Sequence, residues 1–408
     1  MKKGWEIKKL KEIGETQTGN TPSTTDKENY GNFIPFVKPA HFRADGTIDF
    51  EESGLSEKGV KSARIFKANS ILMVCIGATI GKTGFSEIAV TSNQQINALT
   101  PREEFEPRFF YYQFISNSFF RKIIYNSSQA TLPIIIKSKW ENLTVVVPRN
   151  KNEQQQIVSI LDEAFAAINH AKENLQRNLQ NAKELFESEL NSIFTKKGEG
   201  WVERSIEDVA NVVNGFSFKS TDFSPLNRIK SVKITNVGVK EFIEDIDNYL
   251  PERFVNDYSG YLVHEGNIAI ALTRTIISSG LKVAIVPKSY NKALINQRVA
   301  ALIPNDKIIN QRFLYNFLCT NEFANYVKAN VNTLMQPNLS IYDLKKLPIH
   351  CPSLKEQQKI VKQLDALSFQ TKQLEANYQN QINNLEALKK SVLQKAFSGE
   401  LTNKAVTV

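Results

Sequence analysis

The stretch Glu153-Gln154-Gln155-Gln156-Ile157-Val158 opens a run of strong helix formers without proline or glycine that continues to about Lys197. A second stretch, Glu356-Gln357-Gln358-Lys359-Ile360-Val361, opens a similar run that continues to about Ser398. Apolar residues recur in both runs at alternating spacings of four and three, which is the heptad seam of a coiled coil. The predicted seam residues are Ile157, Leu161, Ile168 and Leu175 in the first run and Ile360, Leu364, Leu374, Leu385 and Leu388 in the second. At about 1.5 Å per residue, each run predicts a helix about 60 Å long, and the two helices are expected to pair.

The whole chain is a tandem duplication with a long period. Gly4-Trp5 recurs as Gly200-Trp201, and Asn93–Pro101 matches Asn296–Pro304. Aromatic residues continue the match, and on this count Phe120 pairs with Phe323. Between Gly19 and Asn93 the copies scarcely align with the stretch from Gly215 to Asn296, which is seven residues longer. Each half is therefore predicted to be a shared frame around a divergent insert.

The frame of each half is typical of an α/β globule. Ile71–Ile76 and its counterpart Ile268–Leu272 are apolar runs short enough for buried strands. Glu106–Asn117 and Asn310–Thr320 have the apolar periodicity of helices that face a core.

These elements predict an α+β fold with two tandem α/β domains joined by two long helices. The predicted boundaries are 1–150 and 198–353 for the domains, 151–197 and 354–399 for the helices, and 400–408 for a tail. The first helix ends where the second domain begins, and that domain returns the chain at Pro352 to start the second helix. Antiparallel pairing is the arrangement that this connection favours, with an approximate two-fold axis across the middle of the coiled coil.

Composition sets broad limits on the class of protein. The chain has 408 residues and a formal charge of +9, which allows an anionic partner such as nucleic acid without requiring one. The cysteines Cys75, Cys319 and Cys351 are far apart in sequence, which fits neither a disulfide framework nor a zinc site and is typical of a reducing, cytoplasmic compartment. No apolar run is long enough to predict a membrane span.

The turn Gly77-Ala78-Thr79-Ile80-Gly81-Lys82-Thr83 partly matches a phosphate-binding P-loop. Its glycines are separated by three residues, whereas a P-loop has four, so a nucleotide-hydrolysing site is not predicted. Two interpretations stay open, a tight turn between strands and a turn whose N–H groups and Lys82 contact a phosphate backbone. The related stretch Thr273–Gly280 has lost the Gly-Lys pair.

No catalytic or metal constellation emerges from the sequence. The four histidines are scattered, and no two lie at a metal-ligand spacing. The Asn-Pro-Pro-aromatic motif of methyltransferases and the dinucleotide fingerprint are both missing. We therefore expect a chain that is not an enzyme and that binds no metal.

Polar and basic residues in and beside the inserts are candidates for DNA contact. Arg or Lys reads guanine, and Asn or Gln reads adenine, through paired hydrogen bonds in the major groove. For each single residue, ordinary surface charge is the competing interpretation. The candidates are Lys38, His41, Arg43, Thr79, Lys82, Gln94 and Gln95 in the first half, and Lys219, Lys233, Asn236, Arg274, Gln297 and Arg298 in the second.

Along its whole length the chain resembles the specificity (S) subunits of type I restriction-modification systems. The resemblance is carried by the Gly-Trp openings, by Thr18–Pro22, Ile34–Pro39, Gly77–Lys82 and Asn93-Gln94, and by the Glu-Gln-Gln starts of both long helices. The second half departs from the pattern, since Ile229–Ile234 replaces Pro-Phe-Val-Lys-Pro and the Gly-Lys turn is absent.

The resemblance implies a function. Each domain would be a target recognition domain that binds one half of an asymmetric, bipartite site on double-stranded DNA. The paired helices would hold the domains apart and dock two methyltransferase subunits, and restriction subunits that act as translocases would join them. S-adenosylmethionine, ATP and Mg would be bound by the partner subunits and not by this chain.

Three alternatives are weighed against this interpretation. A stand-alone bipartite DNA-binding protein would bind its site without partners. A specificity subunit of a related methyltransferase system would lack the restriction subunit. An enzyme would need the Gly-Lys turn for turnover, so Lys82→Ala would abolish activity and not merely weaken binding.

Overall fold

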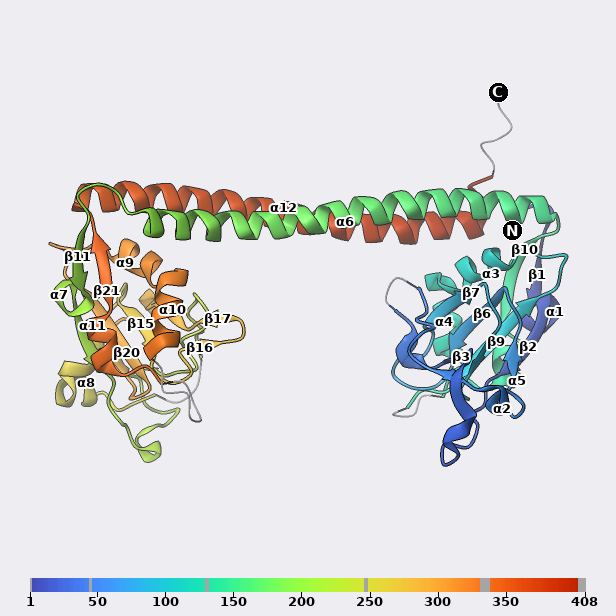
Figure 1. Ribbon diagram of the computed structural model, residues 1–408, viewed down its shortest axis with the longest axis horizontal. Helices are drawn as coiled ribbons and strands as arrows, with labels where there is room; N and C mark the ends of the chain where they lie inside the picture. Colours follow the sequence, from blue (N-terminus) through green and yellow to red (C-terminus); the bar gives the residue numbers. More distant parts are fainter. Residues whose placement is uncertain (1, 44–45, 129–131, 246–248, 331–337, 403–408) are drawn as a thin grey trace, which may run out of the picture. The chain divides into compact units, whose positions relative to one another are not determined.

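The computed structural model describes residues 2–43, 46–128, 132–245, 249–330 and 338–402. The chain divides into two compact units, each with one globular domain and part of both long helices (Figure 1). Unit 1 comprises Met1–Gln176 and Gln379–Val408, and unit 2 comprises Arg177–Tyr378. Of the predicted tail, 403–408 lies outside the described residues.

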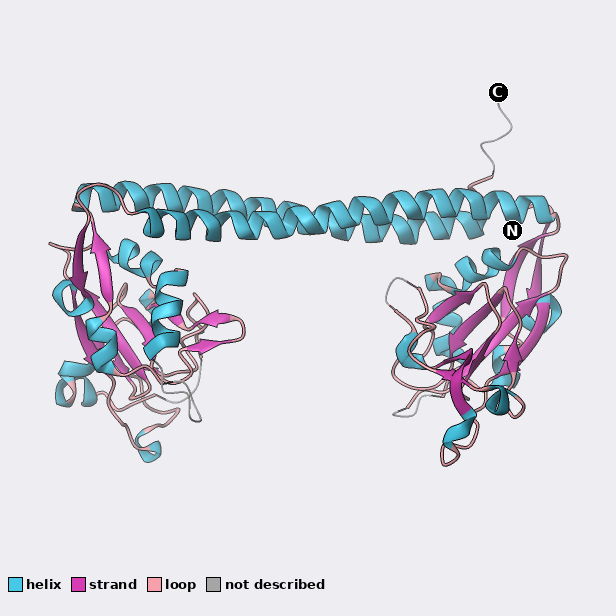
Figure 2. Ribbon diagram, in the orientation of Figure 1, coloured by secondary structure: helices cyan, strands magenta, loops and turns pink. Residues whose placement is uncertain are grey.

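Unit 1 contains three small sheets with helices packed around them (Figure 2). The opening strand β1 (Trp5–Lys9) pairs antiparallel with β10 (Thr144–Pro148), the last strand before the long helix. The central antiparallel sheet has the order β2 (Gly14–Thr18), β9 (Ile96–Pro101), β6 (Ser70–Val74) and β7 (Thr83–Ser86). The insert forms a third sheet with the order β4 (Gly54–Leu55), β3 (Tyr30–Val37), β8 (Val90–Ser92) and β5 (Ile65–Phe66). The helical segments are α1 (Leu10–Ile13), η1 (Lys27–Asn29), η2 (Pro39–His41), α2 (Glu57–Val60), α3 (Pro107–Phe114), α4 (Asn117–Asn126) and α5 (Lys137–Trp140).

Unit 2 repeats this frame around a different insert. Strands β11 (Val202–Ser205) and β21 (Pro348–Cys351) form the opening pair. The central sheet has the order β12 (Ala210–Asn214), β20 (Val299–Pro304), β15 (Ile268–Ala271) and β18 (Val283–Ile285), and the insert sheet has the order β13 (Ser231–Val232), β19 (Ala293–Ile295) and β14 (Leu262–Val263). A hairpin of β16 (Ile276–Ile277) and β17 (Gly280–Leu281) has no counterpart among the described residues of unit 1. The helical segments are α7 (Ile206–Val209), η3 (Ser220–Asp222), α8 (Phe254–Asp257), η4 (Ser259–Tyr261), η5 (Lys288–Tyr290), α9 (Gln311–Phe317), α10 (Asn321–Asn330) and α11 (Ile341–Lys346).

The predicted buried strands and amphipathic helices are present in both units. Strand β6 is buried at every position, and it ends at Val74, before the predicted Ile76. All three cysteines are free thiols and are buried. Within the described ranges, no helix is long and apolar enough to cross a membrane.

The two long helices, α6 (Lys151–Lys196) and α12 (Leu354–Ser398), run antiparallel within each unit. In unit 1 the first part of α6 packs beside the last part of α12, where the Lys172 Nζ and Glu386 Oε1 atoms are 2.5 Å apart. In unit 2 the last part of α6 packs beside the first part of α12, where Gln363 donates to Glu189 at 3.1 Å. The predicted fold class, two tandem α/β domains joined by an antiparallel helix pair, is confirmed.

The buried side chains along the two long helices do not follow a strict heptad repeat. Ile157, Leu161, Ile168, Ile360 and Leu364 are buried, and Leu175 and Leu385 are half-buried. The predictions for Leu374 and Leu388 are wrong, since these side chains are 40% and 48% exposed, while Ile382, one residue beyond a strict heptad position, is buried. A helix with 3.6 residues per turn drifts about 20° per heptad from a strict 3.5-residue repeat. Over four heptads that drift approaches one residue, which accounts for the shift from the predicted seam.

A buried glutamine fixes the start of each long helix to its domain. The Gln357 amide nitrogen donates to the carbonyl oxygens of Pro352 at 2.9 Å and Ile308 at 3.1 Å. Its oxygen accepts from the Asn310 N–H at 2.7 Å. Gln154 makes the matching contacts in unit 1, to the Pro148 carbonyl and from the Glu106 N–H, both at 2.9 Å. The second residue of the repeated Glu-Gln-Gln motif is therefore structural.

The alignment of the two halves changes by one residue before α4. The Ser116 hydroxyl accepts from the Phe119 N–H, and the Thr320 hydroxyl accepts from the Phe323 N–H, both at 3.3 Å. Phe119 and Phe323 are both buried, whereas Phe120 is 44% exposed. The predicted pairing of Phe120 with Phe323 is wrong, because unit 2 has one extra residue in the turn before α10, near Cys319.

Candidate nucleic-acid interface

Most of the predicted contact residues lie where strands end at one edge of their unit. In the antiparallel order β2-β9-β6-β7, the ends of β2 and β6 share an edge with the starts of β9 and β7. Strand β3 runs parallel to β8, so both also end on one side. We call the segments 18–22, 38–43, 75–82 and 93–95 the loop edge of unit 1. The corresponding segments 214–216, 233–236, 272–282 and 296–298 form the loop edge of unit 2.

A close contact between two loops holds the predicted glutamines in place. A Cβ added at Gly19 would collide with the backbone oxygen of Asn93, and a Cβ at Gly215 would collide with that of Asn296. Only glycine allows this approach, which explains why it recurs in both halves. Gln94 lies on the turn, exposed, and its side-chain oxygen accepts from the Thr21 hydroxyl at 2.7 Å.

The neighbouring turn residues differ between the units. Gln95 is half-buried, and its side-chain oxygen accepts from the Asn93 amide at 3.0 Å. At the same place in unit 2, Gln297 and Arg298 are exposed, and within the described part of the chain their side chains have no hydrogen-bond or ion-pair partner. Unit 2 therefore presents an amide and a guanidinium from this turn, whereas unit 1 presents chiefly one amide.

His41 and Asn236 occupy equivalent, buried positions. The His41 Nδ1 atom accepts from the Lys38 N–H at 3.3 Å, and the Asn236 Oδ1 atom accepts from the Lys233 N–H at 2.8 Å. Their residues are 3% and 0% exposed. The prediction that these two side chains contact DNA is therefore wrong: they shape the loop that carries the preceding lysine.

The two lysines of this loop remain accessible at the edge. The ammonium of Lys38 lies 5.6 Å from the centroid of the Phe36 ring, and that of Lys233 lies 2.8 Å from the Asp245 carboxylate. Their backbones are fixed by the His41 and Asn236 contacts. Each unit therefore presents one lysine from the same backbone framework, with a different neighbour.

The Gly-Lys turn of unit 1 links β6 to β7. Gly77 and Gly81 have φ angles of 101° and 86°, a region that favours glycine. Thr79 is half-buried, and its carbonyl accepts from the Lys82 N–H at 3.1 Å. The Lys82 side chain is exposed, and its ammonium lies 3.4 Å from the Phe42 carbonyl oxygen.

Unit 2 lacks the Gly-Lys pair, since Leu281 precedes Lys282, but it retains a lysine at the end of this turn. The Ala271 N–H donates to the Lys282 carbonyl at 3.1 Å, as the Val74 N–H donates to the Lys82 carbonyl at 2.8 Å. The inserted hairpin of β16 and β17 lengthens the turn, so that Lys282 falls just beyond the stretch Thr273–Gly280 with which the turn was aligned. Arg274, with φ 51°, takes the left-handed position of Gly77. The signal in the sequence was Gly280-Leu281-Lys282, just before β18.

Local electrostatics differ around these cations. Burial, and to a smaller extent the nearby Arg274 charge, lowers the pKa of Lys282, whose ammonium donates to the Ile234 carbonyl at 2.9 Å. Arg43 is exposed, and its guanidinium lies 2.5 Å from the Asp49 carboxylate. Lys219 is exposed at the start of η3, outside the segments that define the loop edge and just after segment 214–216.

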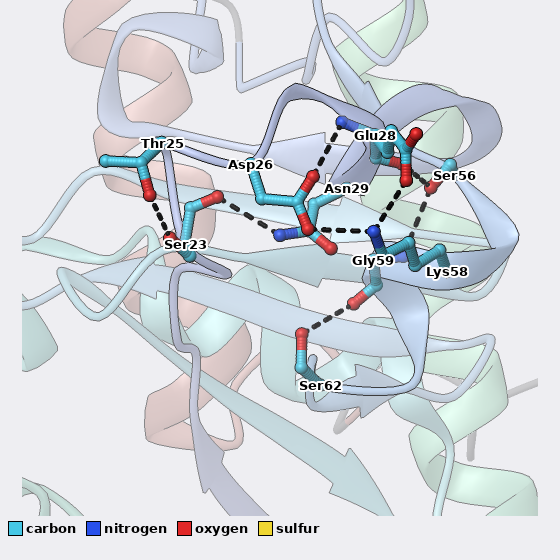
Figure 3. A network of polar contacts seen from close by, with 9 residues as sticks. All are labelled: Ser23, Thr25, Asp26, Glu28, Asn29, Ser56, Lys58, Gly59 and Ser62. Carbon is cyan, nitrogen blue, oxygen red and sulfur yellow. Dashed lines mark hydrogen bonds and ion pairs between the residues drawn. The ribbon is translucent and has the colours of Figure 1, made fainter.

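A polar network supports the first insert and uses one of its basic side chains (Figure 3). The Lys58 ammonium lies 2.9 Å from the Asp26 carboxylate and 2.6 Å from that of Glu28. Hydrogen bonds to these two carboxylates raise the pKa of Lys58, and the one from Lys58 lowers the pKa of Asp26. A Cβ at Gly59 would collide with the Asn29 backbone oxygen. Lys58 therefore serves to pack α2 against η1.

The two loop edges combine fixed backbone turns with exposed amides and cations. Cations fix a protein on phosphates, and amide or guanidinium groups can read base edges. Within the described residues, no group of three His, Cys, Asp or Glu side chains is arranged to hold a metal ion. The arrangement therefore suits binding of an anionic polymer.

Comparison with known proteins gives consistent matches over nearly the whole chain. The family model for the type I restriction modification DNA specificity domain matches residues 2–177 and 198–384. The specificity subunit of the type I restriction enzyme MjaVIII from Methanocaldococcus jannaschii is 23% identical over 383 residues, covering 89% of this chain and 86% of that protein.

Solved structures share the fold. A chain from a study of complex assembly in the type I R-M system has a TM-score of 0.80 at 15% identity, covering 98% of this chain and 99% of that chain. The HsdS subunit from Thermoanaerobacter tengcongensis has a TM-score of 0.62 at 16% identity, covering 98% and 97%. Because the family model matches both halves of the chain, the chain belongs to the type I restriction modification DNA specificity domain family.

Proposed function

We propose that this chain is the DNA-recognition subunit of a type I restriction-modification complex and reads a bipartite, asymmetric target. The observation that carries the proposal is the repeated loop edge. Both units hold a lysine at the 38/233 position, a lysine at the 82/282 position and a glutamine at the 94/297 position on matching backbone turns.

The asymmetry of the target follows from what differs between the two edges. Gln95 is replaced by Arg298, and Gly77 is replaced by Arg274. Guanidinium groups favour guanine, whereas glutamine amides favour adenine. The shared lysines would give each unit a similar, salt-dependent contact with phosphates, and the differing residues would give each unit its own half-site.

The paired long helices are the proposed docking surface for two methyltransferase subunits, and restriction subunits would join that assembly. Leu374, Leu388 and Phe369 on α12 are 40%, 48% and 64% exposed, which suits apolar contact with a partner. In this proposal S-adenosylmethionine, ATP and Mg are bound by the partner subunits. The chain itself contributes recognition without catalysis, in the cytoplasm where the DNA lies.

Genome-wide mapping of methylated bases tests the proposal. A host that carries this chain with its methyltransferase should methylate one motif made of two different half-sites with a fixed spacer. A host with the methyltransferase alone is the control and should lack that motif. A continuous, unsplit motif, or the same motif in the control, would contradict the proposal.

A further inference from the structure

Unit 1 has a groove between α4 and the last turns of α12. Its lining includes Arg43 and Lys82 from the loop edge and Lys389 and Lys390 from α12, with Phe120 on the α4 side. A second hollow continues it along α4 and α12 and is lined by Arg121 and again by Lys390. We call the two together the α4–α12 groove.

Positive charge is in excess in this groove. Glu386 is the one carboxylate among the lining residues of the described chain, and it is already bonded to Lys172 at 2.5 Å. That hydrogen bond, with smaller contributions from Lys389 and Lys390, lowers the pKa of Glu386. The charge of this carboxylate is therefore already paired with that of Lys172. Lys390 and Arg121 are exposed, and neither has a carboxylate within 4 Å among the residues described.

Two cations of this groove are replaced at the corresponding positions of unit 2. On the alignment of α6 with α12, Lys390 corresponds to Glu187, which forms an ion pair with Lys240. On the alignment of α4 with α10, Arg121 corresponds to Asn325, and Ser118 to Glu322. Glu322 lies 3.8 Å from the Lys197 ammonium. Because the frame is shared, the exchange of lysine for glutamate is a difference in surface charge and not in fold.

We propose that the α4–α12 groove of unit 1 binds backbone phosphates of the DNA target through Arg121 and Lys390, two cations that unit 2 does not share. The inference rests on the proposed function and extends it, since it makes the end of α12 part of the DNA-binding surface. Charge complementarity supports DNA as the occupant, and so does continuity with Lys82, the lysine that both loop edges share. Phosphate contacts carry no base preference, so the groove adds affinity to the half-site of unit 1 and not specificity.

The test is the salt dependence of binding by the assembled complex with a duplex that carries both half-sites. The double variant Arg121→Gln/Lys390→Gln should reduce the slope of log K against log salt by about 0.9 for each phosphate that it no longer neutralises, or about 1.8 in all. The conservative variant Arg121→Lys/Lys390→Arg should retain the wild-type slope. This pair separates a loss of charge from a loss of folding.

A matched control removes two exposed lysines from the part of α12 in unit 2. Lys362→Gln/Lys372→Gln makes the same charge change on the same helix, and its slope should equal that of the wild type. An unchanged slope in the groove variant, or an equal reduction in this control, would contradict the proposal that the groove binds DNA phosphates. Loss of assembly with the methyltransferase at an unchanged slope would indicate that the groove binds an acidic surface of a partner protein. That result would also contradict the proposal. Failure of the wild-type complex to prefer the target over unrelated duplex would contradict the proposed function itself.

Discussion

At the scale of single residues, His41 and Asn236 have the same structural role but different side chains. Each is buried, and each accepts a hydrogen bond from the N–H of the lysine three positions earlier. Burial is the main cause that lowers the pKa of His41, with Lys38 acting in the same direction and Glu52 and Asp49 opposing it. The neutral ring is therefore the form that the loop holds.

A pH dependence follows for unit 1. Because the folded pKa of His41 is lowered, its contribution to stability is complete above the unfolded pKa of about 6.5 and is lost as the pH falls below that value. His41→Asn, the residue that unit 2 uses, should reduce this loss between about pH 7 and pH 5. Thermal unfolding of wild type and variant across that range measures it. Equal acid sensitivity of the two proteins would show that His41 is not the group responsible.

At the scale of elements, the paired helices deviate from the predicted seam in a testable way. Ile382 is 8% exposed and Leu388 is 48% exposed, although the strict heptad placed Leu388 on the seam. Ile382→Ala should therefore lower the free energy of unfolding by about 2 kcal/mol or more. Leu388→Ala should cost less than about 1 kcal/mol.

Denaturant unfolding of the isolated chain measures both changes, and the two variants serve as each other's control. Because the chain forms two units, the transition of unit 1 must be followed separately from that of unit 2. A larger loss of unfolding free energy for Leu388→Ala than for Ile382→Ala would show that the seam follows the strict heptad after all.

Elements also show where inference from sequence succeeds. The two long helices, the buried strands and the shared frame all follow from periodicity and from self-similarity. Lys282 could not be placed, because a hairpin inserted between it and β15 is invisible to a count of residues. The prediction of DNA contact failed for His41 and Asn236 because residue type indicates chemistry but not burial. The predicted seam is displaced because a small angular drift accumulates along a long helix.

At the scale of the whole molecule, the shared frame and divergent inserts predict modular exchange. The frame contacts at Gly19 and Asn93 lie at the two ends of the first insert, so the insert can be replaced between them. Replacing residues 20–92 with the equivalent segment of another family member should change one half of the methylated motif and leave the other half and the spacer unchanged. Methylation mapping of the chimera measures this.

The matched control for the exchange is a chimera at residues 216–295. It should change the opposite half of the motif. If both halves changed in either chimera, the two units would not be independent readers.

The buried glutamines at the starts of the long helices have a mechanical consequence. A domain cannot swivel about the Pro352–Leu354 connection without breaking the hydrogen bonds of Gln357 to Pro352, Ile308 and Asn310 in a site that excludes water. The joint is therefore fixed and not a hinge. A partner protein that binds the first turns of either helix therefore also fixes the orientation of the domain attached to that helix.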